Sequence, residues 1–317
     1  MRKSRVAIAL TGAVSLIIAL VTFASPAAAA SGDSVPPGEG LDARAAAGVE
    51  SSVSPLASWY SGSVAAGATQ HWTWNNASLT SAYQVGLSPT GASTSAVCQF
   101  RVTRAWDLQR YGGEREFHFY LKNVGSIACG TTVLLSSMTA SNTWSTGGIE
   151  SGAAKSWTWN NANPLTATHL VGVSPAGATS SNACQLEVTR SWYVQQPGGE
   201  REFHLTIKNV GAIACTGNVQ LARNTAANSS WSTGSISVGA SKSWTWNNAN
   251  PLDRVYLPGL SPLGAVGSTP CQLQVSQTSY QQRINANGLT EREFNLTVTN
   301  VGSRACSGTV LLNYLTA

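Results

Sequence analysis

Glu116-Phe117-His118-Phe119-Tyr120-Leu121-Lys122 alternates polar and apolar side chains without interruption. A period of two residues is typical of a half-buried β-strand, so the apolar side chains should face a core and the polar ones the solvent. The same alternation returns at residues 202–208 and 293–299. Other short stretches of this kind, such as 98–102, are separated by turn residues, and no helical period is present. The sequence therefore predicts an all-β protein.

This stretch belongs to a pattern that occurs three times. Trp-Thr-Trp-Asn-Asn begins at Trp72, Trp157 and Trp244, at spacings of 85 and 87 residues, and each copy is followed by Cys, Glu-Arg-Glu-Phe, Asn-Val-Gly and a second Cys. The period exceeds that of most solenoid repeats and approaches the size of a small domain. We expect three tandem antiparallel β-sandwich domains of immunoglobulin-like type, one in each repeat. Their predicted bounds are residues 58–140, 141–226 and 227–317.

Six cysteines, two in each repeat, indicate a disulfide framework. Fifteen pairings of six cysteines are possible. Pairing within each repeat is favoured because each copy must solve the same folding problem, and each bond would contribute ~3 to 4 kcal/mol in the chain-entropy description. The long spacing, with no Cys-x-x-Cys or histidine pair beside it, disfavours a metal site. The predicted disulfides are Cys98–Cys129, Cys184–Cys215 and Cys271–Cys306.

The first thirty residues are typical of a signal peptide, with basic residues, an apolar run and a small-residue stretch. Residues 31–57 are rich in Ser, Pro, Gly and Ala and are predicted to be a flexible leader. Removal of residues 1–30 leaves 16 basic against 14 acidic residues, a net charge of +2. This charge is too small for a nucleic-acid or anionic-membrane footprint. We expect a secreted, extracellular protein with no integral membrane segment after signal removal.

Lys-Asn-Val-Gly at residues 122–125 and 208–211, the hairpin expected after it, and Gly-Ala at residues 67–68 and 239–240 carry a resemblance. They resemble the bacterial adhesion-associated immunoglobulin-like domains called CARDB, over about half of each repeat. In that family's phase a domain would start at the first cysteine of each repeat, and this chain would begin and end with half domains that complete each other in cis or between molecules. We favour the simple phase, in which each repeat is one domain.

The tryptophans divide into two groups. Trp72 and Trp74 lie two residues apart and share one face of a strand, either as a platform for sugar rings or as part of the core. The core interpretation is favoured because the opposite face is uniformly polar. A tryptophan also begins each repeat among Ser, Thr and Gly residues. Those three, Trp59, Trp144 and Trp231, are the preferred candidates for exposed, ligand-binding aromatic residues.

The Glu-Arg-Glu motif places Glu114 and Glu116 on one strand face, and Glu202 holds the equivalent place in repeat 2. Two carboxylates suggest glycoside hydrolysis, but the motif occurs three times and ion pairing with Arg104 or Arg190 explains it better. No residue is therefore predicted to be catalytic. Glu116 and Glu202 are instead predicted to contact a ligand, together with the nearby Trp106 and Trp192.

Histidines give no consistent metal or general-base site. The Glu-Arg-Glu-Phe strand carries His118 and His204 in two repeats, but the third has Asn295. His71 and His169 have no counterparts and are expected at the surface. No metal ligand set and no cofactor motif is recognised.

Repeat 3 departs from the others at one position. Trp106 and Trp192 are matched there by Ser279. Loss of a core tryptophan would cost about 3 kcal/mol or more. Either Trp106 and Trp192 are therefore exposed in a ligand patch that repeats 1 and 2 share, or the terminal repeat 3 repacks around Ser279 because it has no following neighbour. Both interpretations stay open at this point.

Together these features predict a secreted, non-catalytic protein that binds an extracellular polysaccharide or a cell-envelope surface at several sites. An active site needs to be built once, whereas a binding module gains avidity when copied. The alternative is a structural or assembly protein, or a protein-binding inhibitor, with possible self-association through strand edges.

Overall fold

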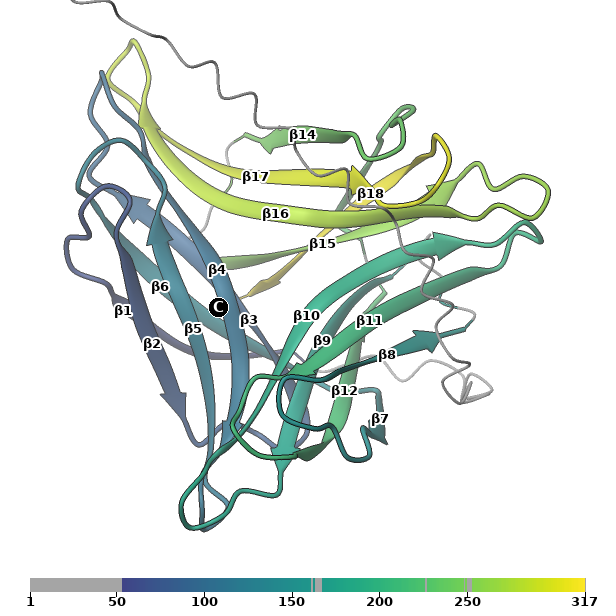
Figure 1. Ribbon diagram of the computed structural model, residues 1–317. Coiled ribbons are helices and arrows are strands. Elements are labelled where there is room, and N and C mark those ends of the chain that lie inside the picture. The colour runs from purple at the N-terminus through teal and green to yellow at the C-terminus, as the bar shows by residue number, and fades with distance from the viewer. Residues whose placement is uncertain are drawn as a thin grey trace, which may run out of the picture. The chain divides into compact units, whose positions relative to one another are not determined.

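The computed structural model describes residues 53–160, 162, 167–225, 227–247, 249 and 253–316, and every element in them is a β-strand (Figure 1). Each repeat contributes six strands. Repeat 1 contains β1 (Val53–Tyr60), β2 (Thr69–Asn75), β3 (Ser81–Thr90), β4 (Cys98–Gln109), β5 (Arg115–Asn123) and β6 (Gly130–Thr139). Repeat 2 contains β7 (Asn142–Ser145), β8 (Ala154–Trp159), β9 (Thr168–Ala176), β10 (Cys184–Gln195), β11 (Arg201–Asn209) and β12 (Thr216–Asn224). Repeat 3 contains β13 (Ser229–Ser232), β14 (Ser241–Trp246), β15 (Arg254–Leu263), β16 (Cys271–Ile284), β17 (Thr290–Asn300) and β18 (Ser307–Thr316).

The strands of each repeat form two antiparallel layers. In repeat 1 the orders are β1-β6-β3 and β2-β5-β4, and the equivalent strands of repeats 2 and 3 pair in the same way. The alternating stretch that begins at Glu116 lies in β5, the middle strand of the second layer. The all-β, antiparallel prediction is confirmed, and the immunoglobulin-like assignment stays a prediction.

The first strand begins earlier than expected. Residues 53–57 belong to β1, although the sequence assigned them to the flexible leader, and they pair with β6 from Leu135 to Met138. Pro55 contributed to the prediction of a flexible leader, but it lies in an edge strand, beside a register shift in the pairing of β1 with β6. A proline is tolerated there because its missing N–H is not needed by a second neighbour. Residues 1–30 and the rest of the leader lie outside the described residues.

One disulfide joins the two layers inside each repeat. The bonds are Cys98–Cys129, Cys184–Cys215 and Cys271–Cys306, as predicted. The first cysteine of each pair starts the outermost strand of one layer, and the second lies just before the central strand of the other. All six are buried in the core, which is built from the inward-facing side chains of both layers.

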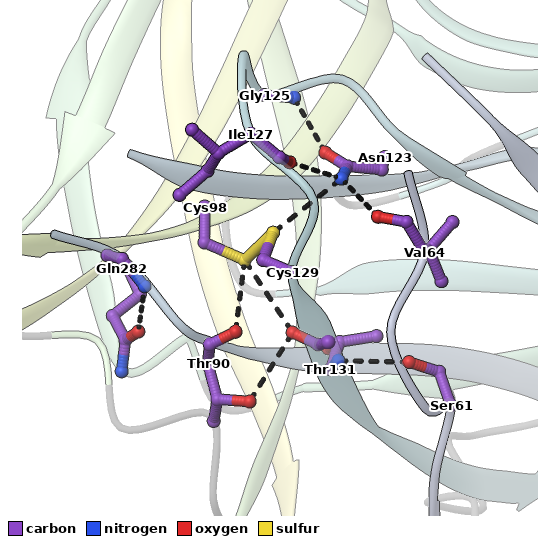
Figure 2. The surroundings of a disulfide bond; sticks show 12 residues. Ser61, Val64, Thr90, Cys98, Asn123, Gly125, Ile127, Cys129, Thr131 and Gln282 are labelled. Carbon is purple, nitrogen blue, oxygen red and sulfur yellow. Dashed lines mark hydrogen bonds between the residues drawn. A yellow bond between two sulfur atoms is a disulfide. The ribbon is translucent and has the colours of Figure 1, made fainter. Parts of the chain in front are cut away.

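Asn123 explains why Asn-Val-Gly recurs. Figure 2 shows its side-chain amide donating to the carbonyl oxygens of Val64 (2.9 Å) and Ile127 (2.8 Å), while its oxygen accepts from the N–H of Gly125 (2.9 Å). Asn209 and Asn300 repeat this arrangement. One buried side chain thereby satisfies three backbone groups beside the disulfide, where an unsatisfied group would be costly.

The three repeats are joined through one strand each. One edge of β4 pairs with β5, and its other edge is shared: Cys98–Phe100 pairs with the end of β16, and Asp107–Gln109 pairs with the start of β10. The end of β10 pairs with the start of β16, which closes the cycle. Repeats 1, 2 and 3 thus share a nine-stranded sheet.

Equivalent glycines allow the other layers to meet. A Cβ added to Gly172 in β9 would lie 2.8 Å from Cα of Ala82 in β3, and one added to Gly86 would lie 2.8 Å from a methyl group of Val255. The third glycine, Gly259, approaches repeat 2 in the same way. A second core cluster forms here from side chains of all three repeats. Its members are Ala82, Leu134, Met138, Leu170, Ala222, Val255, Leu257 and Leu315.

Candidate functional site on the outer sheet faces

We define the outer face of each repeat as the side of the β2-β5-β4 layer, or of its equivalent, that points away from the sandwich core. The middle threonine of each Trp-Thr-Trp motif is exposed on it, because alternation along the strand directs the flanking tryptophans to the core. These residues are Thr73, Thr158 and Thr245. The core interpretation of the Trp-Thr-Trp motif is therefore correct.

In repeats 2 and 3 the outer faces carry cross-strand hydroxyl pairs. Ser156 pairs with Thr206 (2.9 Å) between β8 and β11. Between β14 and β17, Ser243 pairs with Thr297 at 2.8 Å. A further pair, Ser241 with Thr299, lies at 2.7 Å. The hydroxyl oxygens are therefore held at the strand spacing on an exposed sheet surface.

In repeat 1 the outer face carries a connected polar cluster. His118 Nε2 donates to Glu116 Oε2 (2.8 Å), and the guanidinium Nε of Arg110 donates to Glu116 Oε1 (2.5 Å). On the other side of the ring, His118 Nδ1 lies 3.0 Å from His71 Nε2 and 3.1 Å from Thr73 Oγ1. Since Nε2 holds the proton that Glu116 accepts, Nδ1 of a neutral His118 must be the acceptor.

Trp106 covers the two imidazole rings. Its indole stacks on His71 (5.2 Å between ring centroids, 12° between planes) and on His118 (5.0 Å, 11°). Tyr120 contacts the same indole, and the guanidinium of Arg104 lies 4.8 Å from it. Trp106 is only 7% exposed. Trp106 is therefore a buried side chain that covers the cluster, and not the exposed aromatic residue of the ligand-patch interpretation.

Burial and hydrogen bonding set the charges in this cluster. Burial alone would raise the pKa of Glu116, but hydrogen bonds from Arg110 and His118 outweigh it and hold that pKa below its ordinary value. Burial lowers the pKa of His118, although Glu116 opposes this. At neutral pH the arrangement is therefore a carboxylate that orients a neutral imidazole, whose free nitrogen faces His71 and Thr73.

Repeat 2 retains half of this arrangement. His204 Nε2 donates to Glu202 Oε2 (2.8 Å), Trp192 stacks on His204 at 5.0 Å, and Thr158 Oγ1 lies 3.1 Å from His204 Nδ1. The hydrogen bond from His204 is the largest cause of a lowered pKa of Glu202. Ser156 occupies the position of His71. Trp192 is half-buried, so it is more accessible than Trp106.

Repeat 3 replaces the cluster with other contacts. Asn295 accepts from Thr245 Oγ1 (2.7 Å), and Glu293 pairs with Arg283 (2.6 Å). Ser279, at the position of the tryptophan, is 2% exposed and accepts from Gln99 Nε2 of repeat 1 (3.0 Å). Repeat 3 therefore has a following neighbour, repeat 1, and the small serine makes room for its glutamine.

The expected exposure of Trp59, Trp144 and Trp231 is corrected by the structure. All three are half-buried and pack against the core. In repeat 1, Trp59 stacks on Trp74 (6.4 Å, 10°), which closes the side of the sandwich where the edge strands β1 and β2 meet. The predicted ligand residues therefore separate: the Trp106 and Trp192 group lies with Glu116 and Glu202 on the outer faces, and the Trp59 group does not.

Two further expectations were wrong. Arg104 pairs with Glu187 of repeat 2 (2.8 Å), whereas Glu116 pairs with Arg110. His169 is 6% exposed, because it occupies the core-facing position that Tyr83 holds in repeat 1, and burial lowers its pKa to about 3.

Sequence reasoning also missed a pairing partner of His118. His71 was assigned to the surface without a role, and it is indeed exposed. However, β2 pairs with β5 so that His71 is opposite Tyr120, which lies two residues from His118 on the same face of the sheet. The usable signal was that His71 lies on the polar side of its strand. The register that brings it to His118 is a property of the pairing.

The chain matches no protein-family model, no curated protein and no solved structure. No helix in the described part of the chain is long and apolar enough to span a membrane. Among the described residues, no group of three or more His, Cys, Asp or Glu side chains is arranged to hold a metal ion.

Proposed function

We propose that the protein is a secreted, non-catalytic, multivalent binding protein whose ligand is an extracellular polysaccharide, either free or at a cell-envelope surface. The observation that carries the proposal is that outer faces bearing an exposed central threonine are repeated three times and are held by the closed β4-β10-β16 pairing. A repetitive polymer can contact such copies together, which multiplies weak affinities by about 10² to 10⁴.

The chemistry of the outer faces supports a neutral sugar polymer. The exposed hydroxyl groups of Ser243 and Thr245 can both donate to and accept from sugar hydroxyls. Charged residues make up 10% of the whole chain, so nonspecific attraction of polyanions is weak. The three disulfides fit an extracellular location, because such bonds persist in oxidising surroundings.

The test is retention of the protein on insoluble chitin, cellulose, peptidoglycan and whole cells. A triple variant with Thr73→Glu, Thr158→Glu and Thr245→Glu places one charge on each outer face and should lose retention. The matched control has Ser58→Glu, Thr143→Glu and Ser230→Glu, which are exposed at equivalent positions of the opposite layer. Single substitutions should weaken retention stepwise if the sites act together.

If both triple variants lose retention equally, the added negative charge and not its position on the outer face is the cause. If the threonine variant is still retained, the outer faces are not the binding surface. Lack of retention on every matrix would overturn the polysaccharide ligand. It would favour the structural or protein-binding alternative, which analytical ultracentrifugation with and without candidate protein partners would then test.

A further inference from the structure

The polar cluster of repeat 1 has a feature that sugar binding does not use. Two imidazole nitrogens, His71 Nε2 and His118 Nδ1, face each other at 3.0 Å, and Thr73 Oγ1 lies 3.1 Å from the second. The two rings are nearly parallel, with 16° between their planes. His71 is exposed, so solvent reaches this point from one side, while Trp106 covers the rings.

We propose that His71 and His118 form a binding site for one divalent transition-metal ion of the zinc, copper or nickel type, completed by water and the Thr73 hydroxyl. Imidazole nitrogen is a preferred ligand of these metals. Two nitrogens bound to one tetrahedral zinc at 2.0–2.1 Å each lie roughly 3.3 Å apart. Metal binding would replace the His71–His118 hydrogen bond: the exposed His71 ring would turn and carry its proton on Nδ1, so that His71 Nε2 and His118 Nδ1 both direct a lone pair to the ion.

The neighbours of His118 favour metal binding in a specific way. A metal-binding histidine usually donates its second ring N–H to a carboxylate, which fixes the tautomer and directs the other nitrogen to the metal. Glu116 accepts this hydrogen bond from His118 Nε2 and is itself held by Arg110. Since this hydrogen bond places the ring proton on Nε2, His118 Nδ1 carries the lone pair that a metal ion needs.

Repeat 2 supplies a control within the same chain. It has the carboxylate, the oriented histidine, the stacked tryptophan and the threonine, but Ser156 replaces the second imidazole. The proposal therefore assigns one metal ion to the protein, in repeat 1. It also implies that Ser156→His would complete an equivalent site beside His204.

The experiment is isothermal titration of the untagged protein with ZnCl₂ at pH 7.5, repeated with CuCl₂ and NiCl₂. We expect one ion per chain. His71→Ser, which installs the residue of repeat 2 at an exposed position, should weaken binding at least tenfold, and Ser156→His should raise the stoichiometry to two. Glu116→Gln should weaken binding about 10- to 100-fold through the orientation of His118.

Thermal unfolding without metal checks that each variant is folded. Because Glu116 is buried, weaker metal binding by Glu116→Gln supports the proposal only if the exposed variant His71→Ser also binds more weakly. The proposal is overturned if none of the three metals binds with a dissociation constant below 1 mM, an order-of-magnitude limit for a site of this kind. Binding that His71→Ser leaves unchanged overturns it equally. Retention on polysaccharide is a separate readout, so the two proposals can fail independently.

Discussion

At the residue scale, one core position is occupied by different side chains in the three repeats. Tyr83, His169 and Tyr256 occupy equivalent places, and each stacks on a phenylalanine of the central strand. Burial of His169 lowers its pKa from 6.5 to about 3. The unfolded chain therefore binds a proton between pH 6.5 and 3 that the folded protein does not bind, so stability decreases as the pH falls through this window.

We predict that His169→Tyr removes this acid sensitivity. The difference in free energy of unfolding between the variant and the native protein should shift by about 3 kcal/mol in favour of the variant when the pH is lowered from 7.5 to 4. Urea unfolding followed by circular dichroism at both pH values measures the difference. His71→Tyr, at an exposed position, is the control, and equal pH profiles for native protein and His169→Tyr would contradict the prediction.

Asp107 has the opposite dependence. It takes the place of the buried tyrosines Tyr193 and Tyr280, and burial raises its pKa from 3.8 to about 8 although the residue as a whole keeps some exposure. The folded protein therefore retains a proton between pH 4 and 8 that the unfolded chain has lost. Stability should decrease as the pH rises through this window.

Asp107→Asn should accordingly stabilise the protein at pH 8 by about 1 to 3 kcal/mol and have little effect at pH 4. Thermal unfolding at the two pH values measures this, with Asp253→Asn, an exposed carboxylate, as the control. A stabilisation that is the same at both pH values would show that charge is not its cause.

At the element scale, the repeats are joined by caps as well as by strand pairing. Gln195 at the end of β10 accepts from the backbone N–H groups of Gly264 (2.8 Å) and Ala265 (3.1 Å) in repeat 3. Gln109 makes the same contacts with repeat 2, and Gln282 reaches Ala92 of repeat 1. These side chains fix the loop that precedes the first cysteine of the next repeat.

Gln195→Ala should lower stability by about 1 to 3 kcal/mol, because two backbone donors lose their acceptor. Hydrogen exchange should show lost protection at Gly264 and Ala265 while the amides of β9 keep theirs. Thr189→Ala on the exposed part of β10 is the control. Unchanged exchange at the two loop amides would mean that the cap is not needed to hold the loop.

The tryptophan strands show what the sequence could and could not resolve at this scale. Alternation correctly placed Trp72 and Trp74 on the core side of β2. It could not place Trp59, because the ring is buried by contact with a strand of the other layer, Trp74 of β2. Local pattern determines which side of a strand a residue occupies, whereas the packing of layers determines whether that side is covered.

At the scale of the whole molecule, the described repeats share two structures: the β4-β10-β16 cycle and the core cluster formed by side chains of all three. An added methyl group at Gly172 would meet the backbone of Ala82 at 2.8 Å. Backbone at that distance cannot move aside without shifting β3, so strain introduced in repeat 2 should reach repeat 1.

We predict that Gly172→Ala lowers the midpoint of one cooperative thermal transition of the whole protein, with a destabilisation of about 1 to 3 kcal/mol. Differential scanning calorimetry measures both the midpoint and the number of transitions. Gly198→Ala is the control, because nothing lies within 4 Å of an added Cβ there. Three separate transitions, of which only one moves, would contradict a shared core.

The sequence by itself determined the all-β class, the threefold repetition and the disulfide pairs, because alternation, copied motifs and cysteine spacing are local properties that each repeat must satisfy alone. Only the tertiary structure decided that Trp106 covers His71 and His118, that Ser279 accommodates Gln99, and that the last repeat pairs with the first. These contacts depend on strand register and on edges from distant parts of the chain, which no local pattern specifies.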